Sequence, residues 1–252
     1  MRIDLNCDMG ESFGTYVLGY DEQAMPYVTS INVACGFHAS DPSNMLKTVR
    51  AAKKYGAAIG AHPAFPDLVG FGRRAIAASQ QEIYADVLYQ IGALMSICRS
   101  EGLTLQHVKA HGALYNLAEK DIGIATAIAE AIKSLGIDLY MLCSCGSAMV
   151  KAAQNVGIKY VEEAFADRAY TKEGTLVPRS QPGAVIHDIQ EVAERVMNLV
   201  QTGTVKAIDG SKVALQAQTI CVHGDTPGAV DMIKEIRARL DKAGIDVLPF
   251  GK

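Results

Sequence analysis

Three consecutive pieces of the chain decide its fold: AAIGA (57–61), HPAFPDLVGFGRR (62–74) and SQQEIYADVLYQIGALMSICRSE (79–101). The first is short and apolar, as expected of a buried strand. The second is rich in Pro and Gly. In the third, Ser79 and Glu82 have the spacing of a capping box at the start of a long periodic segment. Together they predict a strand, a long loop of the kind that carries an active site, and a helix.

The same strand-then-helix order recurs along the chain. We predict strands at 3–7, 28–34, 57–61, 106–110, 138–142, 158–162, 219–222 and 246–248, and further helices at 42–54, 121–135, 146–156, 187–202 and 228–243. About eight strand-like units alternating with helices favour an α/β fold, an irregular (β/α) TIM-like barrel, and leave a doubly wound open sheet as the alternative. The segments 164–185 and 204–217 exceed ordinary loop length, so we expect them to be functional loops or to contain short elements.

Composition and charge limit what the chain does. Its 252 residues are 49% hydrophobic, which is enough for one full core, so we expect residues 1–252 to form a single barrel domain. The net charge of −3, without clustered basic residues, argues against nucleic acid or an anionic membrane as a partner. We find no long apolar stretch or leader, and the six cysteines are widely spread. We therefore expect a soluble, cytoplasmic protein with its cysteines as thiols.

Ionisable and amide side chains collect where the predicted strands end. In a parallel barrel these ends share one face, where the loops build the active site. Each residue alone has an ordinary explanation, but four of the six histidines lie at or just after strand ends, and histidine suits proton transfer or metal binding. The residues at these ends are Asn6, Asp8, His38, His62, Lys109, His111, Glu162, Glu163, Asp167, Arg168, His223 and Asp225. The pattern predicts one cleft that does chemistry.

Familiar nucleotide and nucleophile motifs are missing from the sequence. Neither G-x-x-x-x-G-K-[ST] nor a G-x-G-x-x-G after a strand occurs, and no G-x-S-x-G supports a serine hydrolase. The stretch GFGRR (70–74) is either an arginine clamp for an anion or a surface loop. The sequence thus predicts no nucleotide cradle of the chain's own.

Seven strand-end motifs resemble one known family. They are NCDMGE (6–11), NVACGFH (32–38), GAHP (60–63), GFGRR (70–74), KAHGALYN (109–116), FADRAY (165–170) and VHGD (222–225). In this order they resemble the LamB/YcsF family, from Met1 to about Val230. The chain departs from the family at Ala110, where a proline is expected, but no reactive group is lost there.

The resemblance implies both a fold and a reaction. The family is similar in fold to the deacetylases and glycoside hydrolases built on irregular (β/α) barrels, and it is known as the A subunit of the prokaryotic 5-oxoprolinase. The implied reaction is the opening of 5-oxo-L-proline to L-glutamate, coupled to hydrolysis of ATP with Mg and carried out with subunits B and C. Because this chain lacks a phosphate-binding loop, we expect a partner to supply much of the ATP site.

The resemblance also suggests roles for individual residues. We expect Asp8, His38 and His62 to activate water and, by analogy with the deacetylases, to hold a divalent metal. Lys109 would stabilise an oxyanion and His111 would exchange protons with the lactam nitrogen. The residues expected to bind substrate are Asn6, Glu11, Arg73, Asp167, Arg168, His223 and Asp225.

Two other functions fit the same residues. A metal-dependent deacetylase or amidohydrolase acting alone would use the same cluster without ATP. A non-catalytic substrate-binding subunit would only capture a small acid for its partners.

Overall fold

The computed structural model describes residues 1–223 and 228–251. Its strands are β1 (Arg2–Met9), β2 (Ser30–Ala34), β3 (Ala58–His62), β4 (Leu105–Val108), β5 (Tyr140–Ser144), β6 (Lys159–Phe165), β7 (Thr204–Lys206), β8 (Lys212–Ala214), β9 (Thr219–Cys221) and β10 (Asp246–Val247). Its helices are α1 (Asp21–Ala24), η1 (Met25–Tyr27), α2 (Pro42–Tyr55), α3 (Gln80–Ser100), α4 (Gly112–Ala118), α5 (Ile122–Ser134), α6 (Ala148–Val156), α7 (Ile189–Thr202) and α8 (Ala229–Lys242). None of these helices is long and apolar enough to cross a membrane.

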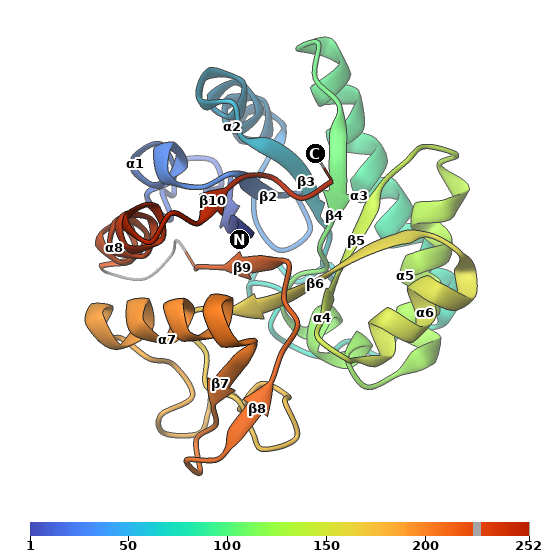
Figure 1. Cartoon of the computed structure of the whole chain (residues 1–252). Coiled ribbons are helices and arrows are strands. Elements are labelled where there is room, and N and C mark those ends of the chain that lie inside the picture. The colour runs from blue at the N-terminus through green and yellow to red at the C-terminus, as the bar shows by residue number, and fades with distance from the viewer. Residues whose placement is uncertain (224–227, 252) are drawn as a thin grey trace.

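Seven parallel strands close into a barrel in the order β1-β2-β3-β4-β5-β6-β9, and β9 pairs back to β1. The longer helices lie around this ring, with α3, α5 and α6 on one side and α7 and α8 on the other (Figure 1). The predicted (β/α) barrel is therefore confirmed, and the open-sheet alternative is wrong because the last barrel strand pairs with the first.

The eighth strand-like unit does not enter the ring. β10 pairs with the first residues of β1, Arg2↔Asp246 and Ile3↔Val247. The chain then places the ring of Phe250 against the rings of His107 and Tyr140. The C-terminal segment thus packs at the end of the barrel where the strands begin, opposite the predicted active-site face.

The two long segments contain short elements. Within 204–217, β7 and β8 form an antiparallel ribbon that lies beside α7 (Figure 1). Within 164–185, isolated bridges join Arg168 to Val185 and Tyr170 to Leu176. These pairings fold the second segment back on itself, and its residues 176–179 line one wall of the site described below.

Local sequence sets the ends of the main helices, and the capping box predicted for the long helix is present. Both bonds of the Ser79–Glu82 capping box form at the start of α3. Asp41 caps α2 by accepting from two backbone N–H groups, and Gly56 ends that helix with φ of 73°. Both helices pack their buried apolar residues on the barrel. The capped ends therefore determine where the neighbouring loops begin.

The barrel interior is unusually polar below the site. Asn32 Nδ2 donates to Asn6 Oδ1 at 2.8 Å, and its Oδ1 lies 2.8 Å from His107 Nε2. A Cβ at Gly60 would lie 2.0 Å from that same His107 nitrogen, so only glycine leaves room for the imidazole. Buried polar groups need partners, and this network supplies them between β1, β2 and β4, while β3 leaves the room at Gly60.

Asp4 forms the lowest layer of this interior, at the seam where β1 meets β2 and β9. Its carboxylate accepts from Thr29 at 2.6 Å, from Ser30 at 2.9 and 2.8 Å, and from the hydroxyl of Thr219. Burial raises the pKa of Asp4 to about 6, although these three hydroxyl donors partly offset burial.

This raised pKa predicts a pH-dependent stability. The native state holds the proton of Asp4 more tightly than the unfolded chain, so the contribution is complete below about pH 4 and is lost as pH rises through about 6. From pH 4 to pH 7 we expect the unfolding free energy of the wild type to fall by about 2.5 kcal/mol relative to Asp4→Asn. Urea unfolding of both proteins across this range measures the difference, and parallel pH profiles would contradict it.

Candidate active site

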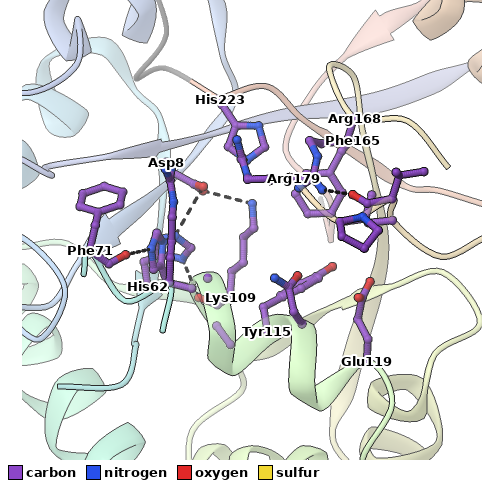
Figure 2. Close-up of a pocket in the computed structure, with 18 of the residues that line it drawn as sticks. Asp8, His62, Phe71, Lys109, Tyr115, Glu119, Phe165, Arg168, Arg179 and His223 are labelled. Carbon is purple, nitrogen blue, oxygen red and sulfur yellow. Dashed lines mark hydrogen bonds and ion pairs between the residues drawn. The ribbon is translucent and has the colours of Figure 1, made fainter. Parts of the chain in front are cut away.

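The barrel has a pocket of about 370 Å³ at the carboxyl ends of its strands. Side chains enter it from strand ends, from α4 and from the loops after β3 and β6 (Figure 2). Its lining includes Asp8, Glu11, His62, Phe71, Arg73, Lys109, His111, Tyr115, Glu119, Phe165, Arg168, Arg179 and His223. Six of the twelve strand-end residues that the sequence singled out thus line one pocket.

Lys109 lies on the floor of the pocket, directly after β4, with its side chain 2% exposed. Its Nζ is 3.1 Å from Asp8 Oδ1, 3.2 Å from Glu163 Oε2 and 2.9 Å from Cys221 Sγ. Burial by itself lowers the pKa of this ammonium, but Asp8, Cys221 and Glu163 outweigh burial and hold the pKa well above its usual value. Burial likewise raises the pKa of Asp8, but His62 and Lys109 outweigh it and hold that pKa well below its usual value. The two groups form a buried ion pair.

His62 and His111 meet beside this ion pair, and their hydrogen bonds fix where their protons lie. His62 Nδ1 is 2.7 Å from the Lys109 carbonyl oxygen, and His111 Nε2 is 2.9 Å from the Phe71 carbonyl oxygen. A carbonyl only accepts, so both nitrogens carry a proton. The other two nitrogens, His62 Nε2 and His111 Nδ1, then face each other at 3.0 Å. Two lone pairs this close repel unless a proton or a metal cation lies between them.

The loop after β3 positions this pair. Gly72 has φ of 64°, and a Cβ there would lie 2.7 Å from His111 Cδ2 and 2.8 Å from His38 Cβ. Its carbonyl accepts from the backbone N–H of Ala113 at 2.9 Å. Glycine therefore lets the loop press against both histidines and deliver the Phe71 carbonyl to His111.

His38 and Glu11 complete the cluster. The His38 ring stacks on His111 with 3.7 Å between centroids, and its Nε2 lies 3.3 Å from Glu11 Oε1. The same Glu11 oxygen is 3.7 Å from His111 Nδ1. Burial first, and the neighbouring histidines next, hold the pKa values of His38 and His111 well below the usual value, so both rings are neutral.

These four residues fit a divalent metal. Glu11, His38, His62 and His111 each offer one ligand atom, and the four atoms lie within 4.8 Å of one another. Neutral imidazoles with one carboxylate are a donor set suited to Zn²⁺ or another first-row transition ion. The facing lone pairs of His62 and His111 are the observation that favours a cation.

The cluster differs in membership from the metal set that the sequence suggested. His38 and His62 are shared, but Glu11 and His111 join them, while Asp8 is held by Lys109. Asp8 Oδ2 is still 3.5 Å from His62 Nε2, so it borders the cluster. Asp8 also groups with Cys221 and His223, but the Lys109 ammonium already lies against the Asp8 carboxylate and the Cys221 sulfur.

A different set of residues forms the opposite wall. His223 Nδ1 is 2.9 Å from both oxygens of Asp167, and Arg179 donates to His223 Nε2 at 3.0 Å. Arg168 donates to the backbone carbonyls of Ala184 and Val177 at 3.3 and 2.6 Å. Of the predicted substrate-binding residues, Arg168 is therefore committed to holding its loop, and His223 lines the pocket.

The remaining predicted residues lie at different depths. Arg73 lines the pocket, with its guanidinium over the Phe71 ring at 4.9 Å. Asn6 is fully buried one layer below, where it contacts Thr219 and Asn32. Asp225 lies outside the described residues.

Several lining residues were not among the sequence candidates. Tyr115 reaches the pocket from α4 and Glu119 from the residue that follows this helix (Figure 2). Tyr115 Oη and Glu119 Oε1 are buried without a hydrogen-bond partner in the described structure. Arg179 comes from the long segment after β6. The motif KAHGALYN contained Tyr115, and unusual loop length was the only sequence signal for Arg179.

Comparison with known proteins places the chain in a family. The sequence model of the LamB/YcsF family matches residues 3–252. The chain belongs to this family. Two relatives are both named as the A subunit of 5-oxoprolinase: the Symbiobacterium thermophilum protein is 51% identical over 98% of this chain and 94% of its own length, and the Pyrococcus furiosus protein is 52% identical over 100% and 98%.

A solved structure supports the same placement. The crystal structure of a lactam utilization protein from Thermus thermophilus matches with a TM-score of 0.95 and 48% identity, covering 99% of this chain and 100% of that one. The LamB/YcsF fold is thus shared over the whole barrel, including the strand ends that carry the pocket.

Proposed function

We propose that this LamB/YcsF chain is the A subunit of an ATP-dependent 5-oxoprolinase. It would work with subunits B and C to open 5-oxo-L-proline to L-glutamate while ATP is hydrolysed. The names of its full-length relatives support this proposal. The observation that carries it is the Asp8–Lys109 ion pair beside the four-residue Glu11, His38, His62, His111 cluster, because this arrangement suits attack of water on a carbonyl group.

The lactam explains the need for ATP. A five-membered lactam is an unactivated amide, and phosphorylation of its carbonyl oxygen would make the carbon a better acceptor of water. We assign the ATP site, with its Mg, mainly to the partner subunits. This chain would bind the lactam and activate the water.

We assign roles from the contacts of each side chain. Asp8, whose Oδ2 lies 3.5 Å from His62 Nε2, would orient the attacking water and receive its proton. His62 would share that role only while no cation occupies its Nε2. Lys109 Nζ would donate to the oxygen on which negative charge develops. Both nitrogens of His111 are already engaged by Phe71 and His62, so we assign it to holding His62, or a cation, in place. A metal held by Glu11, His38, His62 and His111 would polarise the carbonyl or acidify the water.

A metal-dependent hydrolase acting alone is the second candidate, and the same four-residue cluster favours it. It differs in needing no ATP and no partner. A protein that only binds substrate would differ again, since its ligand affinity would survive loss of His62.

The deciding assay measures glutamate release from 5-oxoproline by this chain alone and with subunits B and C, each with and without ATP. We expect release only from the complete mixture with ATP. Metal analysis of the purified chain, and EDTA inhibition beyond that explained by loss of Mg-ATP, test for the bound cation. Turnover of N-acyl substrates by the chain alone, without ATP, would instead support the independent hydrolase.

A further inference from the structure

Arg179 projects into the pocket from the segment after β6, across from Phe71 and His62 (Figure 2). Its Nη2 donates to His223 Nε2 at 3.0 Å. A guanidinium has five N–H donors in a planar fork, so this bond leaves donors for a ligand. The side chain is therefore suited to recognise a group that accepts two hydrogen bonds.

The direction of the His223 bond is set by a buried carboxylate. His223 Nδ1 lies 2.9 Å from both oxygens of Asp167, which is only 4% exposed. Nδ1 therefore carries the proton and the Nε2 lone pair faces the guanidinium. Asp167 and His223 together hold Arg179 in one orientation, and no proton transfer by His223 is needed.

The backbone under Arg179 is also held. Arg168 donates to the carbonyl of Val177 at 2.6 Å, two residues before Arg179. Val177 in turn donates its N–H to the carbonyl of Ala169 at 3.0 Å, and its side chain is buried. The arginine thus stands on an anchored piece of a long loop.

The charge of the pocket indicates what Arg179 binds. The lining contains five Lys or Arg side chains and three Asp or Glu side chains. Asp8 and Glu163 already balance Lys109, whereas the guanidinium of Arg179 donates to a neutral nitrogen of His223 and not to a carboxylate. An anion fits this site, and a carboxylate matches the guanidinium fork in geometry.

We propose that Arg179 binds the carboxylate of the substrate and that His223 and Asp167 position it. The site then selects lactams with a carboxylate on the ring, and the fixed anchor turns the lactam carbonyl toward Lys109. This inference rests on the proposed 5-oxoprolinase function and adds the residue that determines its specificity.

The test compares Arg179→Met with wild type in the complex with subunits B and C. We expect KM for 5-oxoproline to rise about 10- to 100-fold, as for loss of a charge-assisted hydrogen bond, with kcat changed by less than about 3-fold. The neutral lactam 2-pyrrolidinone lacks the carboxylate, so both proteins should process it equally poorly. Arg179→Lys should recover part of the loss, and Lys172→Met, an exposed cation in the same segment, serves as the matched control.

Several results would overturn the proposal. One is an unchanged KM in Arg179→Met. Another is an equal loss on 2-pyrrolidinone, and a third is a large KM effect in Arg73→Met but not in Arg179→Met. If the wild-type complex does not turn over 5-oxoproline, the proposed function fails, and calorimetric titration of 5-oxoproline into the chain then decides about Arg179. Weaker binding by Arg179→Met supports it, whereas equal binding, or none by wild type, rejects it.

Discussion

Replacing Lys109 by methionine is expected to lower kcat/KM for 5-oxoproline by about 1000-fold in the complex with subunits B and C. In the proposed mechanism the ammonium donates to the oxygen on which negative charge develops, and removing such a donor typically lowers the rate about 100- to 1000-fold. Loss of the ion pair also disturbs Asp8, which adds to the effect. Initial rates of glutamate release measure it.

The same change should destabilise the fold. Lys109 Nζ lies 3.1 Å from Asp8 and 3.2 Å from Glu163, so methionine leaves two buried carboxylates without their cation. Breaking a buried pair in this way costs about 3–5 kcal/mol. Urea unfolding of the isolated chain measures this loss separately from activity.

A double variant distinguishes catalysis from structure. Lys109→Met with Glu163→Gln removes one cation and one carboxylate, so we expect it to regain much of the stability. Activity should stay low because the donor is still missing. If activity returns together with stability, Lys109 only holds the fold.

The location of the site could be predicted from the sequence because of one property of parallel barrels. Asp8 and Lys109 are 101 positions apart and yet form an ion pair, since every barrel strand ends on the same face. The alternation of short apolar runs with periodic segments was enough to indicate those ends. The same reasoning placed His62 and His111 in one cleft.

The partners within the cleft could not be predicted in the same way. In β6 two glutamates are adjacent, and alternation alone does not say which one faces inward. Barrel closure decides: Glu163 is 1% exposed and pairs with Lys109, whereas Glu162 accepts from the backbone N–H of Gly146. The pairing of β6 with its neighbouring strands thus determines which of the two glutamates faces the barrel interior.

The other residues of the candidate site could not be predicted because their positions depend on the conformation of loops. Glu11 reaches the histidines because the chain turns at Gly10, which has φ of 72° and is held by Asp21 and Asn44. Arg179 lies in a segment with no periodic pattern, so the length of that segment was the only sign of a functional loop. The seven-residue α4 was also too short to show a helical period, although it carries Tyr115 and Glu119 follows at its end.

Replacing His62 by asparagine is expected to lower kcat/KM by about 100- to 10,000-fold, the range for loss of a proton-transfer group. The asparagine amide can still donate to the Lys109 carbonyl in place of Nδ1, so the cost to stability should stay near the 0.5–1.5 kcal/mol of roughly one hydrogen bond. What is lost is Nε2, the atom that faces both His111 and Asp8. Glutamate release and thermal unfolding measure the two effects.

Two comparison variants make this test specific to Nε2. His62→Gln cannot place its donor at the Nδ1 position, so it should lose more stability than His62→Asn while being equally inactive. His187→Ala removes an exposed histidine before α7 and should leave kcat/KM unchanged. If His62→Asn keeps activity within about tenfold of wild type, below the range for a proton-transfer group, water is activated elsewhere. Asp8 would then be the group to test, because its carboxylate borders the cluster and does not occupy the space between His62 Nε2 and His111 Nδ1.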